Sequence, residues 1–199
     1  MFGGTFDPVH LGHIIVAAAA AETIKAERVV FIPAKKSVLK TADPKAGRRD
    51  RCRMINIAIA QEKDFELSDY ELNKDGPDYT IETVRHFKNR YANTAHLYWL
   101  VGADAAVLLP QWYKIDELIE VCTISVMHRA GYPEPDFSGF ENKFGKKHLA
   151  KLQSNVIKTP LVNISSSEIR RRLAERADVT GMMPVGVVDY IYKLGLYRK

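Results

Sequence analysis

The sequence predicts an α/β fold, a doubly wound parallel sheet with helices on both faces. Short, continuously apolar and β-branched runs alternate with longer helical patterns along the chain, and strands of this kind are typical of a sheet that is buried on both faces. A glycine-rich turn near the start leads directly into the first helical pattern, as it does in many folds of this class. The 199 residues suffice for a single domain spanning 1–199, and we find no repeat or linker that divides them.

The strand that feeds the glycine turn is usually central in such sheets, yet only Met1 and Phe2 precede Gly3. Either this strand is very short or the sequence lacks residues of the natural N-terminus, and we favour the second explanation. Further strands are expected where β-branched and other apolar residues run together, at residues 28–32, 96–101, 122–127 and 161–164.

Helices are expected between and after these strands, at residues 10–25, 48–61, 80–91, 166–175 and 185–194. The last of them places Val187, Ile191 and Leu194 on one face and begins after Pro184. Two stretches, 33–47 and 130–145, are predicted to be loops, and long loops in such domains are often lids or binding loops. Most, but not all, of the lysines of the first loop are expected on the solvated surface; the loop contains Lys35, Lys36, Lys40 and Lys45.

Composition favours a globular, cytoplasmic protein with small anionic partners. The chain is 46% apolar and 27% charged. It has neither the roughly 18-residue apolar stretch that a membrane span requires nor the pattern of a signal peptide. Cys52 and Cys122 have no metal-ligand or disulfide spacing and are expected to be buried free thiols. The net charge of +5 suits nucleotides or nucleic acid, but a basic stripe with interleaved aromatic residues is missing, so we expect no nucleic-acid and no membrane partner.

Residues that carry chemistry concentrate first in GGTFDPVHLGH, residues 3–13. Adjacent glycines let backbone N–H groups approach a ligand closely, and a helix N-terminus presents unpaired N–H donors and partial positive charge to an anion. His10 and His13, in the first helical turn, add donors that are neutral or charged near pH 7. This segment therefore predicts a phosphate site for a nucleoside triphosphate.

A second phosphate-binding segment is predicted in ISSSEIR, residues 164–170. Ser165 and Glu168 have capping-box spacing, so a helix is expected to begin there, and a purely structural cap is the alternative explanation. Serine hydroxyls and helix N-terminal amides can hold phosphate oxygens while a guanidinium clamps another. Of the arginine triplet, we assign Arg170 to the site and leave the next two arginines on the surface.

Taken together, the two segments resemble the H-x-G-H nucleotidyltransferase superfamily, with the signature in residues 3–13 and the second ATP motif in residues 164–170. The resemblance implies a Rossmann-like nucleotidyltransferase fold whose C-terminal part, about 160–199, supplies the second motif and the closing helices. It implies three catalytic residues: His10, His13 and Arg170. The residues that it implies for ATP binding lie in both motifs and after the middle strand: Gly3, Gly4, Thr5, Phe6, Gly12, Gly102, Asp104, Ile164, Ser165, Ser166 and Ser167.

Between the motifs the chain is more similar to the nicotinate-mononucleotide adenylyltransferases than to the pantetheine-phosphate adenylyltransferases. The segments DYTIETV, VGAD with QWY, RCRM and HRAG resemble the Y-T-x-x-T, G-x-D and W, R-x-x-M and R-P-G segments of that subfamily. The family's P-P-H-K loop departs to SVLK at residues 37–40, and Ala130 replaces the proline of R-P-G, which leaves the conformation of the 33–47 loop open. The residues implied for binding the second substrate are Asp7, Lys40, Thr80, Trp112, Tyr113 and Arg129.

Several of these residues have a structural alternative. Trp112 is the candidate to stack on a pyridine ring, with Tyr113 beside it, but core packing is the usual position of a tryptophan. Asp104 either accepts hydrogen bonds from a ribose or caps a helix. Thr80 has the same capping alternative, and Asp7 has the alternative of stabilising the glycine turn. The remaining histidines are assigned no role.

The resemblance implies that AMP passes from ATP to nicotinate mononucleotide, giving nicotinate adenine dinucleotide and pyrophosphate on the way to NAD. Such a displacement needs two positioned polyanions and neutralised charge, and no covalent intermediate. Mg²⁺ is expected mainly on the ATP phosphates, with no metal ligands on the chain. The alternatives are pantetheine-phosphate adenylyltransferase or another ATP-dependent nucleotidyltransferase, and, from a different class, a nucleotide-binding module without catalysis. The sequence leaves open the choice between the acid and the amide mononucleotide, and whether the chain forms homo-oligomers.

Overall fold

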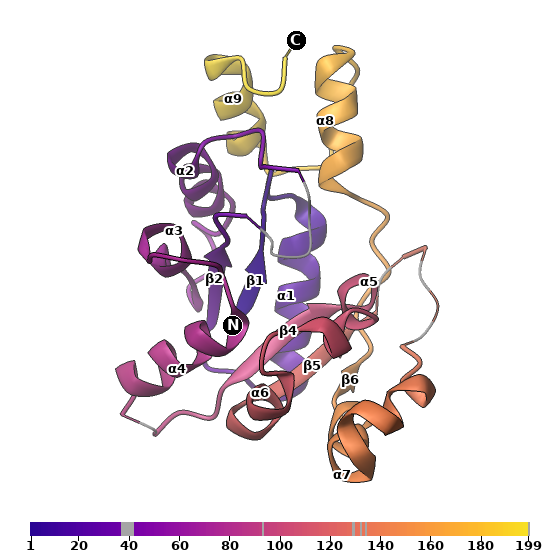
Figure 1. Ribbon diagram of the computed structural model, residues 1–199. Coiled ribbons are helices and arrows are strands. Elements are labelled where there is room, and N and C mark those ends of the chain that lie inside the picture. Colours follow the sequence, from indigo (N-terminus) through magenta and orange to yellow (C-terminus); the bar gives the residue numbers. More distant parts are fainter. Residues whose placement is uncertain (37–41, 93, 129, 132, 134, 199) are drawn as a thin grey trace.

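The structure, a computed structural model, describes residues 1–36, 42–92, 94–128, 130–131, 133 and 135–198. Six strands form one sheet in the order β3-β2-β1-β4-β5-β6, and every neighbouring pair is parallel. The strands are β1 (Phe2–Gly4), β2 (Val29–Pro33), β3 (Phe65–Leu67), β4 (Tyr98–Gly102), β5 (Thr123–Met127) and β6 (Val156–Ile157). The chain winds outward from β1 to β3, returns past β1, and winds outward again from β4 to β6 (Figure 1). This confirms the predicted doubly wound parallel sheet.

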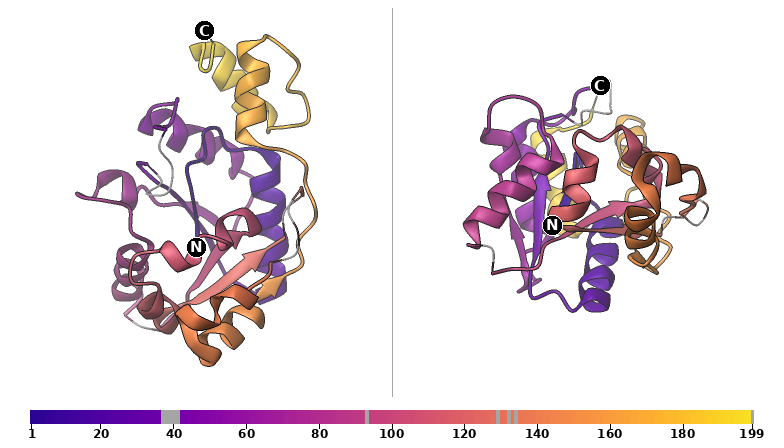
Figure 2. Two further views of the ribbon diagram at one scale, coloured as in Figure 1. Left: turned by 45° about the vertical axis from the view of Figure 1, so that its right-hand side comes forward. Right: turned by 60° about the horizontal axis from the view of Figure 1, so that its bottom comes forward.

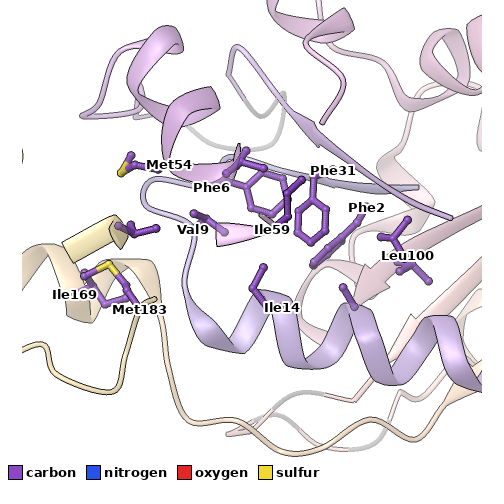
Figure 3. Packing of buried hydrophobic residues seen from close by; sticks show 14 of the residues in the cluster. Phe2, Phe6, Val9, Ile14, Phe31, Met54, Ile59, Leu100, Ile169 and Met183 are labelled. Atoms are coloured by element: carbon purple, nitrogen blue, oxygen red, sulfur yellow. The ribbon is translucent and has the colours of Figure 1, made fainter. Parts of the chain in front are cut away.

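Helices cover both faces of the sheet. They are α1 (Leu11–Ile24), α2 (Arg48–Ala58), α3 (Tyr70–Asn73), α4 (Thr80–Arg90), α5 (Ala103–Ala106), α6 (Ile115–Val121), α7 (Glu141–Gln153), α8 (Ser166–Ala174) and α9 (Val185–Leu194). Alternation along the strands produces two cores. In β2, Val29 and Phe31 pack with residues of α1, α2, α8 and α9, whereas Val30 and Ile32 pack with residues of α4, α6 and α7. Figure 3 shows the first core, in which phenylalanine rings from β1, β2 and the turn after β1 pack together over α1.

The expected strands at 28–32, 96–101 and 122–127 are confirmed as β2, β4 and β5, with small shifts at their ends. The strand that feeds the glycine turn is present as β1, which is short and lies between β2 and β4. The strand expected at 161–164 is wrong, because this segment has no sheet partner and the edge position belongs to β6. Its apolar character has another cause: Ile164 packs against the first core.

The five expected helices are confirmed as α1, α2, α4, α8 and α9. The short helices α3, α5 and α6 were not expected from the sequence pattern. The loop predicted for 130–145 is wrong in its last part, because α7 begins at Glu141. Gly145, which suggests a loop in the sequence, lies inside α7 with φ of 68° and kinks it.

The strand order reverses between β1 and β4, and ligands of open α/β sheets bind outside the carboxyl ends of the strands at such a point. The C-terminal helices α8 and α9 lie together at one end of the molecule, with α9 beside α2 (Figures 1 and 2). The hydroxyl of Tyr190 on α9 donates to Oδ1 of Asp50 on α2 at 2.9 Å, which ties these two helices together. No helix in the described ranges is both long and apolar enough to cross a membrane.

Candidate active site

A cavity of about 810 Å³ lies at the carboxyl ends of three central strands. Gly4, Gly102 and Met127, the last residues of β1, β4 and β5, all line it. Every predicted site residue in the described part of the chain lines this same cavity: Gly3, Gly4, Thr5, Phe6, Asp7, His10, Gly12, His13, Thr80, Gly102, Asp104, Trp112, Tyr113, Ile164, Ser165, Ser166, Ser167 and Arg170. The predicted Lys40 and Arg129 lie outside the described residues. Segments from both ends of the chain are thus brought to one cleft.

The glycines near the start of the chain serve packing as well as ligand approach. A Cβ on Gly3 would lie 2.5 Å from Cζ2 of Trp99, so the indole of β4 fits only against a glycine. A Cβ on Gly12 would lie 3.0 Å from the ring of His10. The sequence analysis explained these glycines by close approach of a ligand alone. The structure shows that neighbouring side chains also require the absence of a Cβ at these positions.

The two histidines form a stacked pair at the start of α1. Their ring centroids are 3.7 Å apart with an interplanar angle of 27°, and the backbone N–H of His10 donates to Nδ1 of His13 at 3.2 Å. Because Nδ1 accepts this bond, the neutral ring of His13 carries its proton on Nε2, which makes Nε2–H a donor. The ring of Phe6 packs edge-on against His13 at 5.0 Å and fixes its plane. Both histidines line the cavity.

The N-terminus of α1 has fewer available amides than the sequence interpretation assumed. The N–H of His10 goes to His13, that of Leu11 to the carbonyl of Met182, and that of His13 to the carbonyl of His10. Within the described ranges, by contrast, the backbone N–H groups of Ser166 and Ser167 donate to no protein acceptor. The start of α8 is therefore the richer source of backbone donors for an anion.

The start of α8 touches the glycine turn directly. The Ser166 hydroxyl donates to the carbonyl of Pro8 at 2.8 Å, and Nη1 of Arg170 donates to the carbonyl of Asp7 at 2.6 Å. These bonds join residues 158 and 163 positions apart in the sequence. They hold the two predicted phosphate-binding segments in one fixed arrangement.

The expected helix start at Ser165 is confirmed, because the Ser165 hydroxyl accepts from the N–H of Glu168 at 3.2 Å. The reciprocal half of the capping box does not form. The Glu168 carboxylate instead binds Arg171 and Arg172 on the outside of the helix. These two arginines are surface residues, as expected, while Arg170 lines the cavity.

The cavity is also lined by Thr80, Trp112 and Tyr113, predicted for the second substrate, and by Asp104, predicted for ATP. Trp112 is half-buried, packs against the second core and lines the cavity, and its Nε1–H has no partner among the described residues. Tyr113 stacks on Tyr79 at 4.3 Å. Thr80 is the first residue of α4, whose N-cap is Tyr79, and Asp104 lies in the first turn of α5, whose N-cap is Gly102. The capping alternative therefore applies to neither Thr80 nor Asp104.

Sequence reasoning missed two buried carboxyls that line the cavity, Glu71 and Asp78. Asp78 Oδ2 accepts the backbone N–H groups of Lys35 and Lys36 at 2.6 and 3.3 Å. The side chain of Lys35 donates to the carbonyls of Lys74 and Gly76, so the expected solvated position is wrong for this lysine. Both carboxyls lie in a polar stretch that looks like surface, and the sequence carries no signal of their burial.

Glu71 is held in an environment that disfavours its charge. The side chain is 4% exposed, and the hydroxyl of Thr83 on α4 donates to its Oε1 at 2.6 Å. Burial raises the pKa of Glu71 to about 7; the nearby carboxylate of Asp78 adds to this, while the Thr83 bond and the ammonium groups of Lys74 and Lys35 oppose it. The carboxyl therefore changes charge close to neutral pH, beside Tyr79 and Thr80 in the cavity wall.

We predict that Glu71→Gln removes a pH dependence of stability. The folded protein holds this proton up to about pH 7, whereas the unfolded chain releases it near 4.5, so the free energy of unfolding falls as pH rises through this window. At pH 8 the variant, which keeps an acceptor for Thr83, should be more stable than wild type by about 3 kcal/mol. Urea denaturation at pH 4 and pH 8 measures the difference, with the exposed Glu62→Gln as control; parallel curves for wild type and Glu71→Gln would contradict the prediction.

Comparisons with known proteins agree in sequence and in fold. The family model of the cytidylyltransferase-like proteins matches residues 1–172. A Clostridium tetani protein described as "Probable nicotinate-nucleotide adenylyltransferase" is 36% identical over 201 residues, 100% of this chain and 98% of that protein. A Clostridium novyi protein with the same description is 33% identical over 202 residues, again with 100% and 98% covered.

A solved structure shares the fold. It is the nicotinic acid mononucleotide adenylyltransferase of Plasmodium falciparum, complexed with NaAD, which matches with a TM-score of 0.77 at 20% sequence identity. The match covers 98% of this chain and 95% of that chain. Nearly the whole chain therefore has the fold of this solved structure.

Proposed function

Because the chain belongs to the cytidylyltransferase-like family and, within it, to the nicotinate-nucleotide adenylyltransferases, we propose that it transfers AMP from ATP to nicotinate mononucleotide. The products are nicotinate adenine dinucleotide and pyrophosphate, in a step of NAD biosynthesis. One observation carries the proposal to this chain's own residues: the histidine pair and the start of α8 line one cleft, held together by the bonds of Ser166 and Arg170 to the glycine turn.

The triphosphate of ATP is bound between the start of α1 and the start of α8. His13 offers Nε2–H, Arg170 offers its guanidinium, and Ser166 and Ser167 offer backbone N–H groups that no described residue uses. The hydroxyl of Thr5, buried in the wall, also lacks a partner among the described residues and completes this set of donors. A polyanion can accept hydrogen bonds from all of these groups.

The reaction needs positioning and charge neutralisation from the protein. The 5′-phosphate oxygen of the mononucleotide attacks the α-phosphorus of ATP in line, and the bond from that phosphorus to the bridging oxygen of pyrophosphate breaks. Negative charge builds on the α-phosphate oxygens and on the leaving pyrophosphate. Donors such as His10, His13 and Arg170, held rigid by stacking and by the carbonyl of Asp7, stabilise that charge without reorganising.

Nicotinate mononucleotide occupies the wall formed by α4, α5 and the segment after α5. Trp112 stacks on the pyridine ring, and its unpaired Nε1–H supplies a polar edge. Asp104, at the end of β4, is the residue proposed to accept hydrogen bonds from the ribose hydroxyls of ATP. Thr80 and Tyr113 border the same space. The proposed roles of Lys40 and Arg129 rest on the sequence alone.

Mg²⁺ enters the proposal as part of the magnesium–ATP substrate, held mainly by phosphate oxygens. In the ranges described, no group of three or more histidine, cysteine, aspartate or glutamate side chains could hold a metal ion. The ion supplies additional neutralisation of phosphate charge when ATP binds.

We place the enzyme in the cytoplasm, where ATP is made and consumed. Both cysteines are free thiols, as a reducing compartment favours. Cys122 is buried as expected, while Cys52 is only half-buried, because it lies on α2 at the edge of the core.

The test of the proposed function is pyrophosphate release from magnesium–ATP with nicotinate mononucleotide as acceptor. Nicotinamide mononucleotide and pantetheine phosphate serve as competing acceptors, and the three values of kcat/KM are compared. We expect the acid mononucleotide to give the highest value. A higher value for pantetheine phosphate would overturn the assignment, and tight ATP binding without pyrophosphate release with any acceptor would favour a non-catalytic module.

We predict that Trp112→Ala weakens binding of the mononucleotide far more than binding of ATP. Stacking of an aromatic side chain on a base contributes about 1–3 kcal/mol, so KM for the acceptor should rise by about 5- to 150-fold while KM for ATP changes about twofold or less. Steady-state kinetics with each substrate varied in turn measures both. Tyr192→Ala on α9, outside the cavity, is the control; equal losses for the two substrates would mean that the indole of Trp112 belongs to the core.

A further inference from the structure

The carboxylate of Asp7 joins two distant segments of the chain to the glycine turn. It is 4% exposed, and it accepts the backbone N–H of Lys45 at 2.7 Å and that of Ala46 at 2.9 Å. The third donor is the hydroxyl of Tyr197, at 2.8 Å from Oδ1. Tyr197 lies 190 positions away, beyond α9, and nothing in the sequence pattern links it to the cavity.

Arg170 approaches the same residue from the other side. Its Nη1 donates to the backbone carbonyl of Asp7 at 2.6 Å but lies 3.9 Å from the carboxylate oxygen Oδ2, too far for a hydrogen bond. Across the described ranges, Arg170 makes no other hydrogen bond. The guanidinium of Arg170 thus bonds to the neutral carbonyl of Asp7 and lies near the carboxylate of the same residue, which accepts hydrogen bonds from other donors.

We propose that Tyr197 is a positioning residue for the triphosphate site: its hydroxyl holds the Asp7 carboxylate and thereby keeps the Arg170 guanidinium available to phosphate. This inference rests on the proposed function of the cavity. Without the Tyr197 hydroxyl, Oδ1 of Asp7 accepts only the N–H of Ala46. The carboxylate is then free to rotate toward Arg170. A direct ion pair of Arg170 with Asp7 then competes with phosphate for the same N–H donors.

The backbone conformation and the pKa of Tyr197 both agree with a role as a positioned hydrogen-bond donor. Its backbone has φ of 65°, a left-handed conformation that bulky side chains adopt only where their surroundings impose it. Burial, together with the nearby carboxylate of Asp7, raises the pKa of Tyr197 above its ordinary value. The phenol therefore remains protonated, and a donor, throughout the pH range in which the enzyme would work.

The test compares Tyr197→Phe with a matched control, Tyr190→Phe. Both variants remove one phenol hydroxyl that donates to a buried or half-buried aspartate, Asp7 in one case and Asp50 in the other. Asp50 and Tyr190 lie outside the cavity. We expect Tyr197→Phe to lower kcat/KM for ATP by about 10-fold, the lower end for one hydrogen bond to a charged group. Tyr190→Phe should change it by about twofold or less.

A double-mutant cycle separates positioning of Arg170 from a general effect on the fold. In the Arg170→Ala background the guanidinium is gone, so Tyr197→Phe should cause little further loss in kcat/KM for ATP. Losses that simply multiply in the double variant would overturn the inference, as would a Tyr197→Phe enzyme with unchanged kcat/KM for ATP.

Binding of a non-hydrolysable ATP analogue gives a readout that does not depend on the acceptor. Calorimetry on the same set should show a higher Kd for Tyr197→Phe and an unchanged one for Tyr190→Phe. If wild type fails to use nicotinate mononucleotide, the proposed function fails while this comparison still decides the role of Tyr197. Equal analogue affinity in wild type and Tyr197→Phe would refute the role even in a fully active enzyme.

Discussion

Replacing His13 by alanine is expected to lower kcat/KM for adenylyl transfer by about 10- to 150-fold, because one charge-assisted hydrogen bond contributes about 1.5–3 kcal/mol. The backbone N–H of His10 fixes Nδ1 of His13, and the ring of Phe6 fixes its plane, so Nε2–H is a preorganised donor in the cavity. Interactions of this kind act mainly where negative charge develops, so the loss should appear in kcat more than in KM for ATP.

The measurement is steady-state kinetics of His13→Ala with both substrates, together with its thermal midpoint. His148→Ala, which removes a ring paired with Glu120 far from the cavity, is the control and should retain wild-type kinetics. A folded His13→Ala enzyme with wild-type kcat and KM would show that His13 takes no part in the reaction. Unchanged kcat with a large rise in KM for ATP would assign His13 to binding of the ground state.

The sequence predicted the two phosphate-binding segments because each of them is a short, continuous stretch of residues. In each segment a few neighbouring residues supply the turn, the helix start and the donors, so a local motif fixes the local geometry. Ser165 shows this: its spacing to Glu168 predicts a helix start, and the bond forms. The parallel sheet then forms the base of the cavity, because it brings the carboxyl ends of β1 and β4 to one edge.

What escaped prediction depends on contacts between segments far apart in the sequence. Tyr197 reaches Asp7 only because α9 packs on α2 and returns the C-terminal segment to the glycine turn. Glu71 is buried only because α3 packs between β2 and α4. A helix of four residues is too short for a hydrophobic periodicity that would predict this burial. The backbone N–H of Leu11 at the start of α1 likewise has a remote acceptor, the carbonyl of Met182.

Apolar runs misled the strand assignment for a similar reason. Residues 161–164 have the composition of a strand, but the edge of the sheet is already taken by β6, whose two residues are too few to stand out. The segment instead crosses to α8 and packs Ile164 on the first core. Leu161 in this segment is 68% exposed, so an apolar composition shows neither burial nor strand pairing, and the sheet order decides which segments are strands.

Replacing Arg51 by methionine is expected to lower the free energy of unfolding by about 3–5 kcal/mol, the cost of removing one partner from a buried charged network. Arg51 is 1% exposed, and its Nη1 donates to the carbonyls of Thr5 and Ala34 at 2.8 and 2.7 Å. Burial lowers the pKa of Arg51, while the carboxylate of Asp7 opposes that shift, so the two buried charges stabilise each other. Methionine fills much of the volume but leaves both carbonyls and Asp7 without this cation.

Urea denaturation followed by circular dichroism measures the effect, with Arg53→Met as the matched control on the exposed side of α2. The control should change stability by about 0.5 kcal/mol or less, as surface substitutions usually do. Because Arg51 joins the turn after β1 to the end of β2, its loss should also lower kcat/KM for ATP in the molecules that remain folded. A stability loss of the control's size would contradict the prediction and show that water or a rearranged side chain satisfies the two carbonyls.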